Sequence, residues 1–316
     1  MEIFELDYPH HVTIDRTGEY SLAIGFFDGL HKGHQQVIGH AVQKAAELGV
    51  RSAVMTFNPH PSHLFGDGKD KVGYITPYEE KVKVLDGLGV DVLFIVRFDW
   101  ELASLSPKQF IDIFIKGLHV KHVTAGFDFT FGSKGVGTME QMSLLSDGSY
   151  GTTVIEKVED ENEKISSTRI RSLLAAGNVE KTAQLLGRPF RTSGEVIHGE
   201  KRGRLLGFPT ANIEADDETI LPKNGVYAVM FTVETKTYFG VCNIGIKPTF
   251  KHPEEIKPLI EVHVLDYEGD LYGQLVLVDW IAHIRDEQKF SSVDELIRQI
   301  GRDKETARTI LEKLVE

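Results

Sequence analysis

Hydrophobic and polar residues follow two different patterns along the chain. Up to about residue 186, short apolar runs alternate with segments whose apolar residues recur at helical spacing. After the Gly187-Arg-Pro189 break, longer segments with a period of two follow one another with few helical stretches. The change of pattern predicts two domains of different fold class, residues 1–186 and 187–316.

The first pattern predicts strands and helices in strict alternation. Two segments, Thr76–Glu79 and Ser106–Gln109, each combine a capping residue, a proline and a capping-box side chain, which is typical of helix starts. Such alternation is typical of a parallel sheet wrapped by helices, so the first domain is expected to be α/β and Rossmann-like. The expected strands are 21–27, 51–57, 92–98, 122–127 and 152–158, and the expected helices are 35–48, 76–88, 106–118, 168–176 and 178–187.

The second pattern predicts a small six-stranded β-barrel, because short strands with turn-rich connections can bury their edges by closing. Ser292–Glu295 is another capping box, and it predicts two terminal helices that run to Leu314. The expected strands are 191–198, 209–214, 226–233, 237–243, 259–265 and 274–284.

Charge and composition narrow the function classes. The chain has 316 residues and a formal net charge of −12, which argues against a general nucleic-acid binder. Apolar runs such as Val92–Val96 fall far below the roughly 20 residues of a membrane span, and the acidic N-terminus lacks the order of a signal peptide. Cys242 is the only cysteine, which excludes an intrachain disulfide and suits a cytoplasmic protein. Any phosphate must therefore be bound by local basic loops and backbone N–H groups.

The segment Gly25–His34 (GFFDGLHKGH) is the densest candidate site. It lies where the first strand passes into its helix, the place where open α/β sheets bind ligands. His31 and His34 share one face of a helix N-terminus, beside backbone N–H groups that can bind a triphosphate. The histidines could also be a metal pair or surface residues, but two glycines and Asp28 beside them favour a nucleotide site. The nucleotide-binding candidates are Gly25, Phe26, Asp28, Gly29, His31, Gly33 and His34.

A second anion site is predicted at Ser167, Thr168 and Arg169, which stand at another helix start. Hydroxyls and a guanidinium beside N–H groups suit the β- and γ-phosphates of a nucleotide. The same residues can simply cap the helix, and the two roles are compatible because both use the same helix end.

A third candidate site opens the barrel at Gly199–Asn212, where basic residues stand among glycines in an acidic protein. Thr210 and Asn212 alternate on a strand, so both oxygens can face one Mg²⁺. On another strand, Glu261 could accept a proton from a substrate hydroxyl, although it could equally decorate the barrel exterior. The candidates for kinase ATP binding are Gly199, Lys201, Arg204, Gly207, Thr210 and Asn212.

These motifs resemble known families. His-x-Gly-His with a later Ser-Ser-Thr-x-Ile-Arg is similar to the nucleotidyltransferases related to class I aminoacyl-tRNA synthetases. Together with Asn58–Pro61 and Gly126–Gly132 it resembles the FMN adenylyltransferase module of bacterial bifunctional riboflavin kinase/FAD synthetase. The resemblance implies that His31 and His34 stabilise the α-phosphate of ATP and that Arg169 holds pyrophosphate. It also implies flavin contacts from Asn58, His60 and Asp128.

The second half resembles the riboflavin kinase domain through Pro-Thr-Ala-Asn, Asn243–Phe250 and Glu261–Asp266. The resemblance implies Thr210 and Asn212 at Mg-ATP, Glu261 as the base that acts on the ribityl hydroxyl, and a flavin site near Arg285. The expected function is therefore a bifunctional enzyme that converts riboflavin to FMN and FMN to FAD with ATP.

Two alternatives stay open. Phe26, Asn58 and Gly135 depart from residues common in the family, so one activity could be lost or redirected. A flavin-sensing protein without turnover is the alternative from another class. The partners expected are the small-molecule substrates riboflavin, FMN and ATP, with no nucleic acid and no membrane.

Overall fold

The computed structural model describes residues 1–8, 18–61, 64, 73–199, 203, 206–216, 218–246 and 258–314. The chain forms two compact units, Met1–Ser166 and Ser167–Glu316. The boundary predicted between residues 186 and 187 stays a prediction. Among the described residues, no helix is both long and apolar enough to cross a membrane.

The first unit is built on a six-stranded parallel sheet in the order β1-β4-β3-β2-β5-β8. From β2 the chain adds β3 and β4 on one side, whereas β5 and β8 are added on the other. The direction of winding therefore reverses between the neighbouring strands β2 and β5. The strands are β1 (Glu2–Leu6), β2 (Tyr20–Ile24), β3 (Arg51–Asn58), β4 (Val92–Arg97), β5 (Val120–Gly126) and β8 (Gly151–Ile155).

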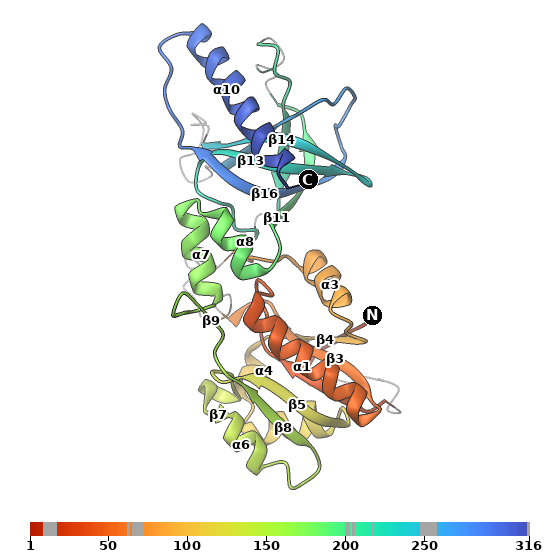
Figure 1. The fold of residues 1–316 in the computed structure, drawn as a ribbon. Helices are drawn as coiled ribbons and strands as arrows, with labels where there is room; N and C mark the ends of the chain where they lie inside the picture. The colour runs from red at the N-terminus through yellow and green to blue at the C-terminus, as the bar shows by residue number, and fades with distance from the viewer. Residues whose placement is uncertain are drawn as a thin grey trace. The chain divides into compact units, whose positions relative to one another are not determined.

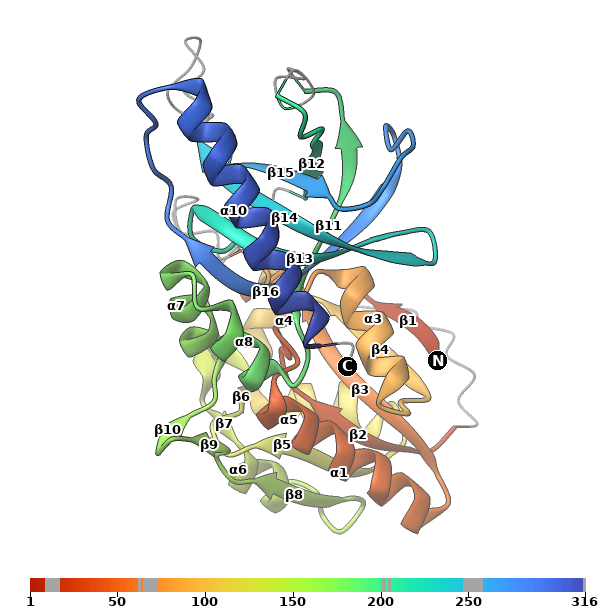
Figure 2. The ribbon, with the colours of Figure 1, turned by 45° about the horizontal axis from the view of Figure 1, so that its top comes forward.

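Helices cover both faces of this sheet, as the alternating pattern predicts. One core joins Ala23, Val54 and Leu93 to the helices α1 (Lys32–Leu48) and α3 (Tyr78–Gly87), which Figure 2 shows over the strands. The other core joins Leu22, Met55 and Phe94 to residues of the opposite face. That face is covered by α4 (Trp100–Ser104), α5 (Pro107–Phe110), a π-helix (Ile111–Lys116) and α6 (Met139–Leu144).

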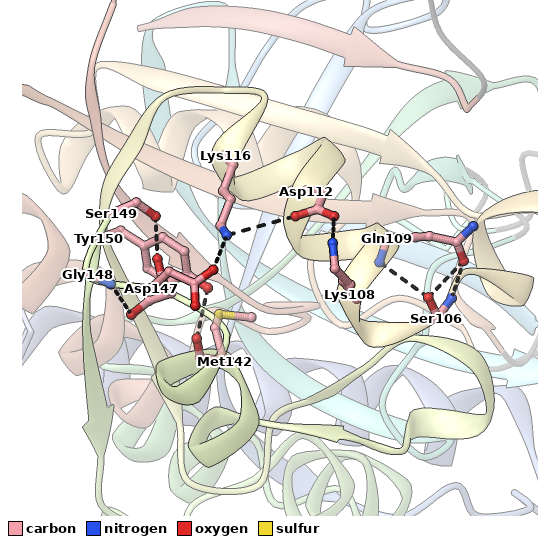
Figure 3. A network of polar contacts seen from close by, with 11 residues as sticks. Ser106, Lys108, Gln109, Asp112, Lys116, Met142, Asp147, Gly148, Ser149 and Tyr150 are labelled. Atoms are coloured by element: carbon pink, nitrogen blue, oxygen red, sulfur yellow. Dashed lines mark hydrogen bonds and ion pairs between the residues drawn. The ribbon is translucent and has the colours of Figure 1, made fainter.

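Polar contacts fix the turns around the π-helix (Figure 3). Ser106 and Gln109 form the predicted capping box at the start of α5. Lys116, at the end of the π-helix, pairs with Asp147 at 3.2 Å and with Asp112 at 4.0 Å. The π-helix is thereby tied to the turn that precedes β8.

Two helix starts differ from the prediction. The helix α1 begins at Lys32 and not at residue 35, because the His31 side chain caps it by accepting a hydrogen bond from the His34 N–H. The helix α3 begins after Pro77 without a side-chain cap. Thr76 is not the cap that the sequence predicts, because α3 begins one residue later, with Pro77 in the cap position.

Short hairpins and turns complete the first unit. They are β6 (Thr130–Phe131), the 3-10 turn η2 (Ser133–Gly135), β7 (Gly137–Thr138), β9 (Glu159–Asp160) and β10 (Glu163–Lys164).

The second unit begins with helices α7 (Ser167–Ala176) and α8 (Val179–Leu186) and continues into a closed barrel. The barrel order is β11-β12-β15-β14-β13-β16, with all neighbours antiparallel. Trp280, Tyr227 and Phe231 are fully buried, and Figure 1 shows α10 (Val293–Glu312) lying along the barrel strands. The strands are β11 (Phe190–Ile197), β12 (Ala211–Ala215), β13 (Gly225–Val233), β14 (Lys236–Ile246), β15 (Pro258–Val264) and β16 (Leu275–Arg285).

The predicted fold class is confirmed in both halves, and two further differences concern β1 and the terminal helix. The edge strand β1 was not predicted, because only Leu6 of its five residues is buried and the apolar pattern is weak. The two predicted terminal helices are one continuous helix, α10, which runs through Gly301 without a break. Ala307 and Leu311 bury one side of α10 against the barrel.

Candidate active sites

The segment Gly25–His34 lies at the carboxyl end of β2, at the point where the winding of the sheet reverses. The loop after the neighbouring strand β5 holds Asp128, and the loop after β3 holds His60. Open parallel sheets bind ligands outside the carboxyl ends of their strands at such a reversal. The topology therefore brings three of the predicted segments to one edge of the sheet.

His31 and His34 form a stacked pair at the start of α1. Their ring centroids are 3.6 Å apart with an interplanar angle of 20°. Gly33 makes this stacking possible, since a Cβ at that position would lie 3.2 Å from the His31 ring. Phe27 closes the other side of His34 with an edge contact at 5.3 Å.

The surroundings of both rings determine which ring nitrogen carries the proton. The Nδ1 of His31 accepts the His34 N–H at 3.2 Å, so His31 must be unprotonated there. The Nδ1 of His34 is buried without a hydrogen-bond partner, and a proton on it would be left without an acceptor. Burial is the main cause that holds the pKa of His34 well below its usual value, and the positive charges of Lys81 and Lys164 lower it further. We infer neutral rings with the proton on Nε2 for both histidines.

Asp28 is buried within the segment Gly25–His34, which we call the nucleotide loop. It is only 2% exposed, and its carboxylate accepts the backbone N–H groups of Ile75 and Thr76 at 3.0 and 3.1 Å. These bonds tie the segment before α3 to the nucleotide loop. Gly29 has a φ of +86°, a conformation that favours glycine.

Three residues of the first unit are expected to contact flavin, and each of them contacts another residue of this unit. The His60 ring packs edge-on against Phe26 at 4.3 Å, and Asn58 accepts a hydrogen bond from Tyr74. Asp128 instead forms an ion pair with Lys164 on β10. Their roles toward flavin stay predictions.

Ser167, Thr168 and Arg169 form the first turn of α7, in agreement with a helix start. They belong to the second unit, so their expected contribution to the nucleotide of the first unit stays a prediction.

The second unit contains a cavity of about 410 Å³ between the outer face of the barrel and α10. Leu296 and Ile300 of α10 form one side, and residues of five barrel strands form the other. The lining residues are Gly203, Leu206, Phe208, Thr210, Asn212, Val226, Val241, Asn243, Glu261, His263, Arg285, Glu287, Gln288, Phe290, Leu296 and Ile300.

Three polar residues form a row across neighbouring strands at this cavity. Glu261 on β15 stands opposite Asn212 on β12 and opposite Asn243 on β14. Ile260 and Val262 are buried in the barrel, so Glu261 faces outward, as its strand alternation predicts. The outer face is nevertheless partly covered here, because residues of α10 and of the loop before β12 also line the cavity.

Glycines let the loop before β12 approach this row. A Cβ at Gly199 would lie 2.2 Å from the Asn212 amide nitrogen, so only glycine allows the backbone this close. Gly207 has a φ of +83°. Lys201 and Arg204, the basic residues expected to bind phosphates, lie outside the described residues.

Comparison with known proteins gives one family for the whole chain. The FAD synthetase model matches residues 14–169, and the riboflavin kinase model matches residues 186–311. Two proteins named bifunctional riboflavin kinase/FMN adenylyltransferase are similar over nearly their full length. The one from Bacillus subtilis is 47% identical over 97% of both chains. The one from Listeria monocytogenes is 43% identical over 97% of this chain and 98% of its own. The chain belongs to this family.

As a bifunctional riboflavin kinase/FMN adenylyltransferase, the protein carries the adenylyltransferase in its N-terminal part and the kinase in its C-terminal part, which confirms the predicted function. A crystal structure described as a macrolide-efflux protein from Streptococcus pneumoniae is also similar. Its TM-score is 0.90 at 35% identity, covering 98% of this chain and 99% of that chain. That description belongs to the pneumococcal protein, and what the comparison shows for this chain is the fold.

Three residues near the two family sites were not predicted from the sequence. Lys81 is buried behind the nucleotide loop, Asn243 completes the polar row, and Asp303 on α10 holds Arg285 at the cavity. Of these three residues, Asn243 is the one that lies in a motif resembling the riboflavin kinase domain. Lys81 shares the buried side of α3 with Leu85, four residues later, and this spacing was the available signal.

Proposed function

We propose that the stacked histidine pair carries FMN adenylylation and that the row Asn212, Glu261 and Asn243 carries riboflavin phosphorylation. The observation that supports this most strongly is the loss of Nδ1 as a donor on both histidines. It leaves two parallel rings with Nε2–H donors at a helix N-terminus, where a phosphate group is expected to bind.

In the adenylyl transfer, a phosphate oxygen of FMN forms a bond to the α-phosphorus of ATP, and the bond from that phosphorus to the β-phosphate oxygen breaks. Pyrophosphate leaves with the electron pair, and FAD is the other product. The Nε2–H groups of His31 and His34 stabilise the charge that develops on the α-phosphate oxygens. No side-chain nucleophile is needed, since positioning and charge stabilisation suffice. Arg169 with Ser167 and Thr168 is proposed to hold the departing pyrophosphate.

In the kinase reaction, Glu261 accepts the proton of the riboflavin 5′-hydroxyl while that oxygen attacks the γ-phosphorus of ATP, and ADP leaves. The position of Glu261 supports this role, because it lies on the wall of the cavity next to two amide side chains. Riboflavin is proposed to occupy the cavity, with its ring system near Arg285 and Phe290.

Thr210 and Asn212 are proposed to hold Mg²⁺ together with the phosphates of ATP. Both line the cavity, and hydroxyl and amide oxygens are hard ligands of the type that Mg²⁺ accepts. The described residues contain no cluster of three carboxylates, histidines or cysteines, which agrees with a site completed by substrate phosphates. When bound, the ion would offset charge on the transferred phosphoryl group.

We retain two further predictions from the sequence. A cytoplasmic location is supported by the single cysteine, which the structure buries at position 242. The absence of nucleic-acid partners is supported by the net charge of −12.

Single variants of the full chain test the two assignments. With His31→Ala, riboflavin, ATP and Mg²⁺ should yield FMN but at least about a hundredfold less FAD. With Glu261→Gln, FMN formation should fall by about a hundredfold or more, whereas added FMN should still be converted to FAD. Chromatography of the flavins measures both reactions.

Matched variants provide the controls. His40→Ala removes another histidine of α1, and Glu214→Gln removes an exposed carboxylate of β12, and neither should change product formation by more than a few-fold. If wild-type protein yields FMN only, the single-activity alternative is correct. If it consumes no ATP and yields neither flavin, the flavin-sensing alternative replaces the proposal.

A further inference from the structure

A lysine is buried behind the nucleotide loop of the first unit. Lys81 lies in the first half of α3 and is only 6% exposed. Lysine is almost never buried unless its charge is paired, so its presence there requires an explanation. No motif of the family resemblance contains it.

The ammonium group of Lys81 contacts the nucleotide loop directly. Its Nζ donates to the Phe26 carbonyl oxygen at 3.3 Å and lies 5.3 Å from the centre of the Phe26 ring. The same carbonyl accepts the Thr56 hydroxyl at 2.9 Å. Two donors therefore fix the backbone of the loop at Phe26, five residues before His31.

Three titratable groups define the electrostatics around Lys81 and His34. The Asp28 carboxylate attracts the Lys81 ammonium, although burial is the larger effect and lowers the pKa of Lys81 to about 8. His34 feels positive charge from Lys81 on α3 and from Lys164 on β10, and it stacks on His31 of its own helix turn. Protonating His34 would thus add a charge next to two lysines and a second histidine.

We propose that Lys81 is a positioning residue for adenylyl transfer, acting on the nucleotide loop through the Phe26 carbonyl. The ammonium charge strengthens this hydrogen bond, and it adds to burial, the main cause of the low pKa of His34. The hydrogen bond holds the loop from Gly25 to Asp28 in place. This inference rests on the proposed role of His31 and His34.

The proposal has a consequence at alkaline pH. Because the pKa of Lys81 is about 8, raising the pH through that value removes its charge. A neutral amine is a weaker donor to the Phe26 carbonyl than an ammonium group. The kcat/KM of FAD formation, which reports groups of the free enzyme, should then fall. Arginine stays charged throughout this range, so Lys81→Arg should lack this alkaline decline.

The test compares Lys81→Met and Lys81→Arg with Lys83→Met, which removes an exposed lysine of the same helix. With FMN and ATP supplied, Lys81→Met should lose at least about tenfold in kcat/KM. Lys81→Arg should retain activity without the alkaline decline, and Lys83→Met should match the wild type. In ¹⁵N-histidine NMR, the pKa of His34 should rise toward 6.5 in Lys81→Met only. Conversion of riboflavin to FMN should be equal in all four proteins.

Two results would overturn the proposal. One is a Lys81→Met protein with the wild-type pH profile and an unchanged His34 titration. The other is an equal loss of activity in both Lys81 variants, together with lower melting temperatures and an unchanged His34 titration. That result would show that Lys81 has a structural role only. If the wild-type protein forms no FAD, the proposed function fails, and the His34 titration still decides whether Lys81 controls that ring.

Discussion

At the scale of single residues, the environment of His34 determines both its chemistry and a pH dependence of stability. The folded protein holds the pKa of His34 well below 6.5, mainly through burial of the ring, whereas the unfolded chain leaves it near 6.5. Below pH 6.5 the unfolded chain binds a proton that the folded chain does not bind. Stability contributed by neutral His34 is therefore complete above pH 6.5 and is lost as the pH falls toward the folded pKa.

We expect the free energy of unfolding of the first unit to fall below pH 6.5, by at most about 1.4 kcal/mol per pH unit from this residue. His34→Gln cannot titrate and should show a smaller decline. Hydrogen exchange of the buried amides of β2 and β4, measured above and below pH 6.5, reports the stability of this unit. Parallel pH dependences in the two proteins would contradict the assignment.

At the scale of elements, one ion pair joins the end of β16 to α10 beside the kinase cavity. Arg285 donates to Asp303 with its Nε at 3.1 Å and its Nη2 at 2.8 Å. Asp303 is 3% exposed and also accepts from Gln299 at 2.9 Å. The Nη1 of Arg285 donates to the Asp286 carbonyl. Hydrogen bonds from Nε, Nη1 and Nη2 therefore hold the guanidinium in place, with its Cζ 5.8 Å from the centre of the Phe290 ring. In the proposed flavin site, Arg285 would therefore provide a flat, fixed surface and few free hydrogen-bond donors.

Replacing Asp303 by Asn should loosen this wall of the cavity. Removing one partner of a buried pair costs roughly 3–5 kcal/mol, so the second unit should unfold more easily. We expect a higher KM for riboflavin, measured by FMN formation, with unchanged conversion of added FMN to FAD. Asp294→Asn removes an exposed acid of the same helix and should leave the KM unchanged. An unchanged KM in Asp303→Asn would show that flavin binding does not depend on this pair.

Most elements could be predicted because their signals are local. Ser106 and Asn178 cap the helices that the sequence assigns to them, and Gly49 and Gly187 end helices in the left-handed conformation. The signal failed where tertiary contacts decide. Thr76 looks like a cap, but α3 begins after Pro77, and Asp28, 48 residues away, holds the Thr76 N–H.

The same distinction applies to the candidate sites. His31 and Glu261 were identifiable because dense motifs surround them in the sequence. Lys81 and Asp303 were not identifiable, because the role of each depends on a partner elsewhere in the fold. Lys81 contacts Phe26, and Asp303 contacts Arg285. A buried charge in an otherwise ordinary helix is recognised only when the fold shows what faces it.

At the scale of the whole molecule, the histidine pair and the cavity with Glu261 belong to different compact units. The histidine pair lies within Met1–Ser166, and the cavity with Glu261 lies within Ser167–Glu316. FMN is the product of one reaction and the substrate of the other. Nothing in either site requires that the FMN consumed by a chain be the FMN made by that chain.

A mixture of two inactivated chains tests this independence. Neither His31→Ala nor Glu261→Gln alone should convert riboflavin to FAD efficiently. Mixed in equal amounts with ATP and Mg²⁺, they should do so, because FMN released by the first variant can diffuse to the second. FAD should appear after a lag, and added FMN should shorten that lag. Each variant mixed with wild-type protein in the same total amount provides the reference rate. A mixture that accumulates FMN without FAD, while Glu261→Gln still converts added FMN, would show that FMN must pass between the units of one chain.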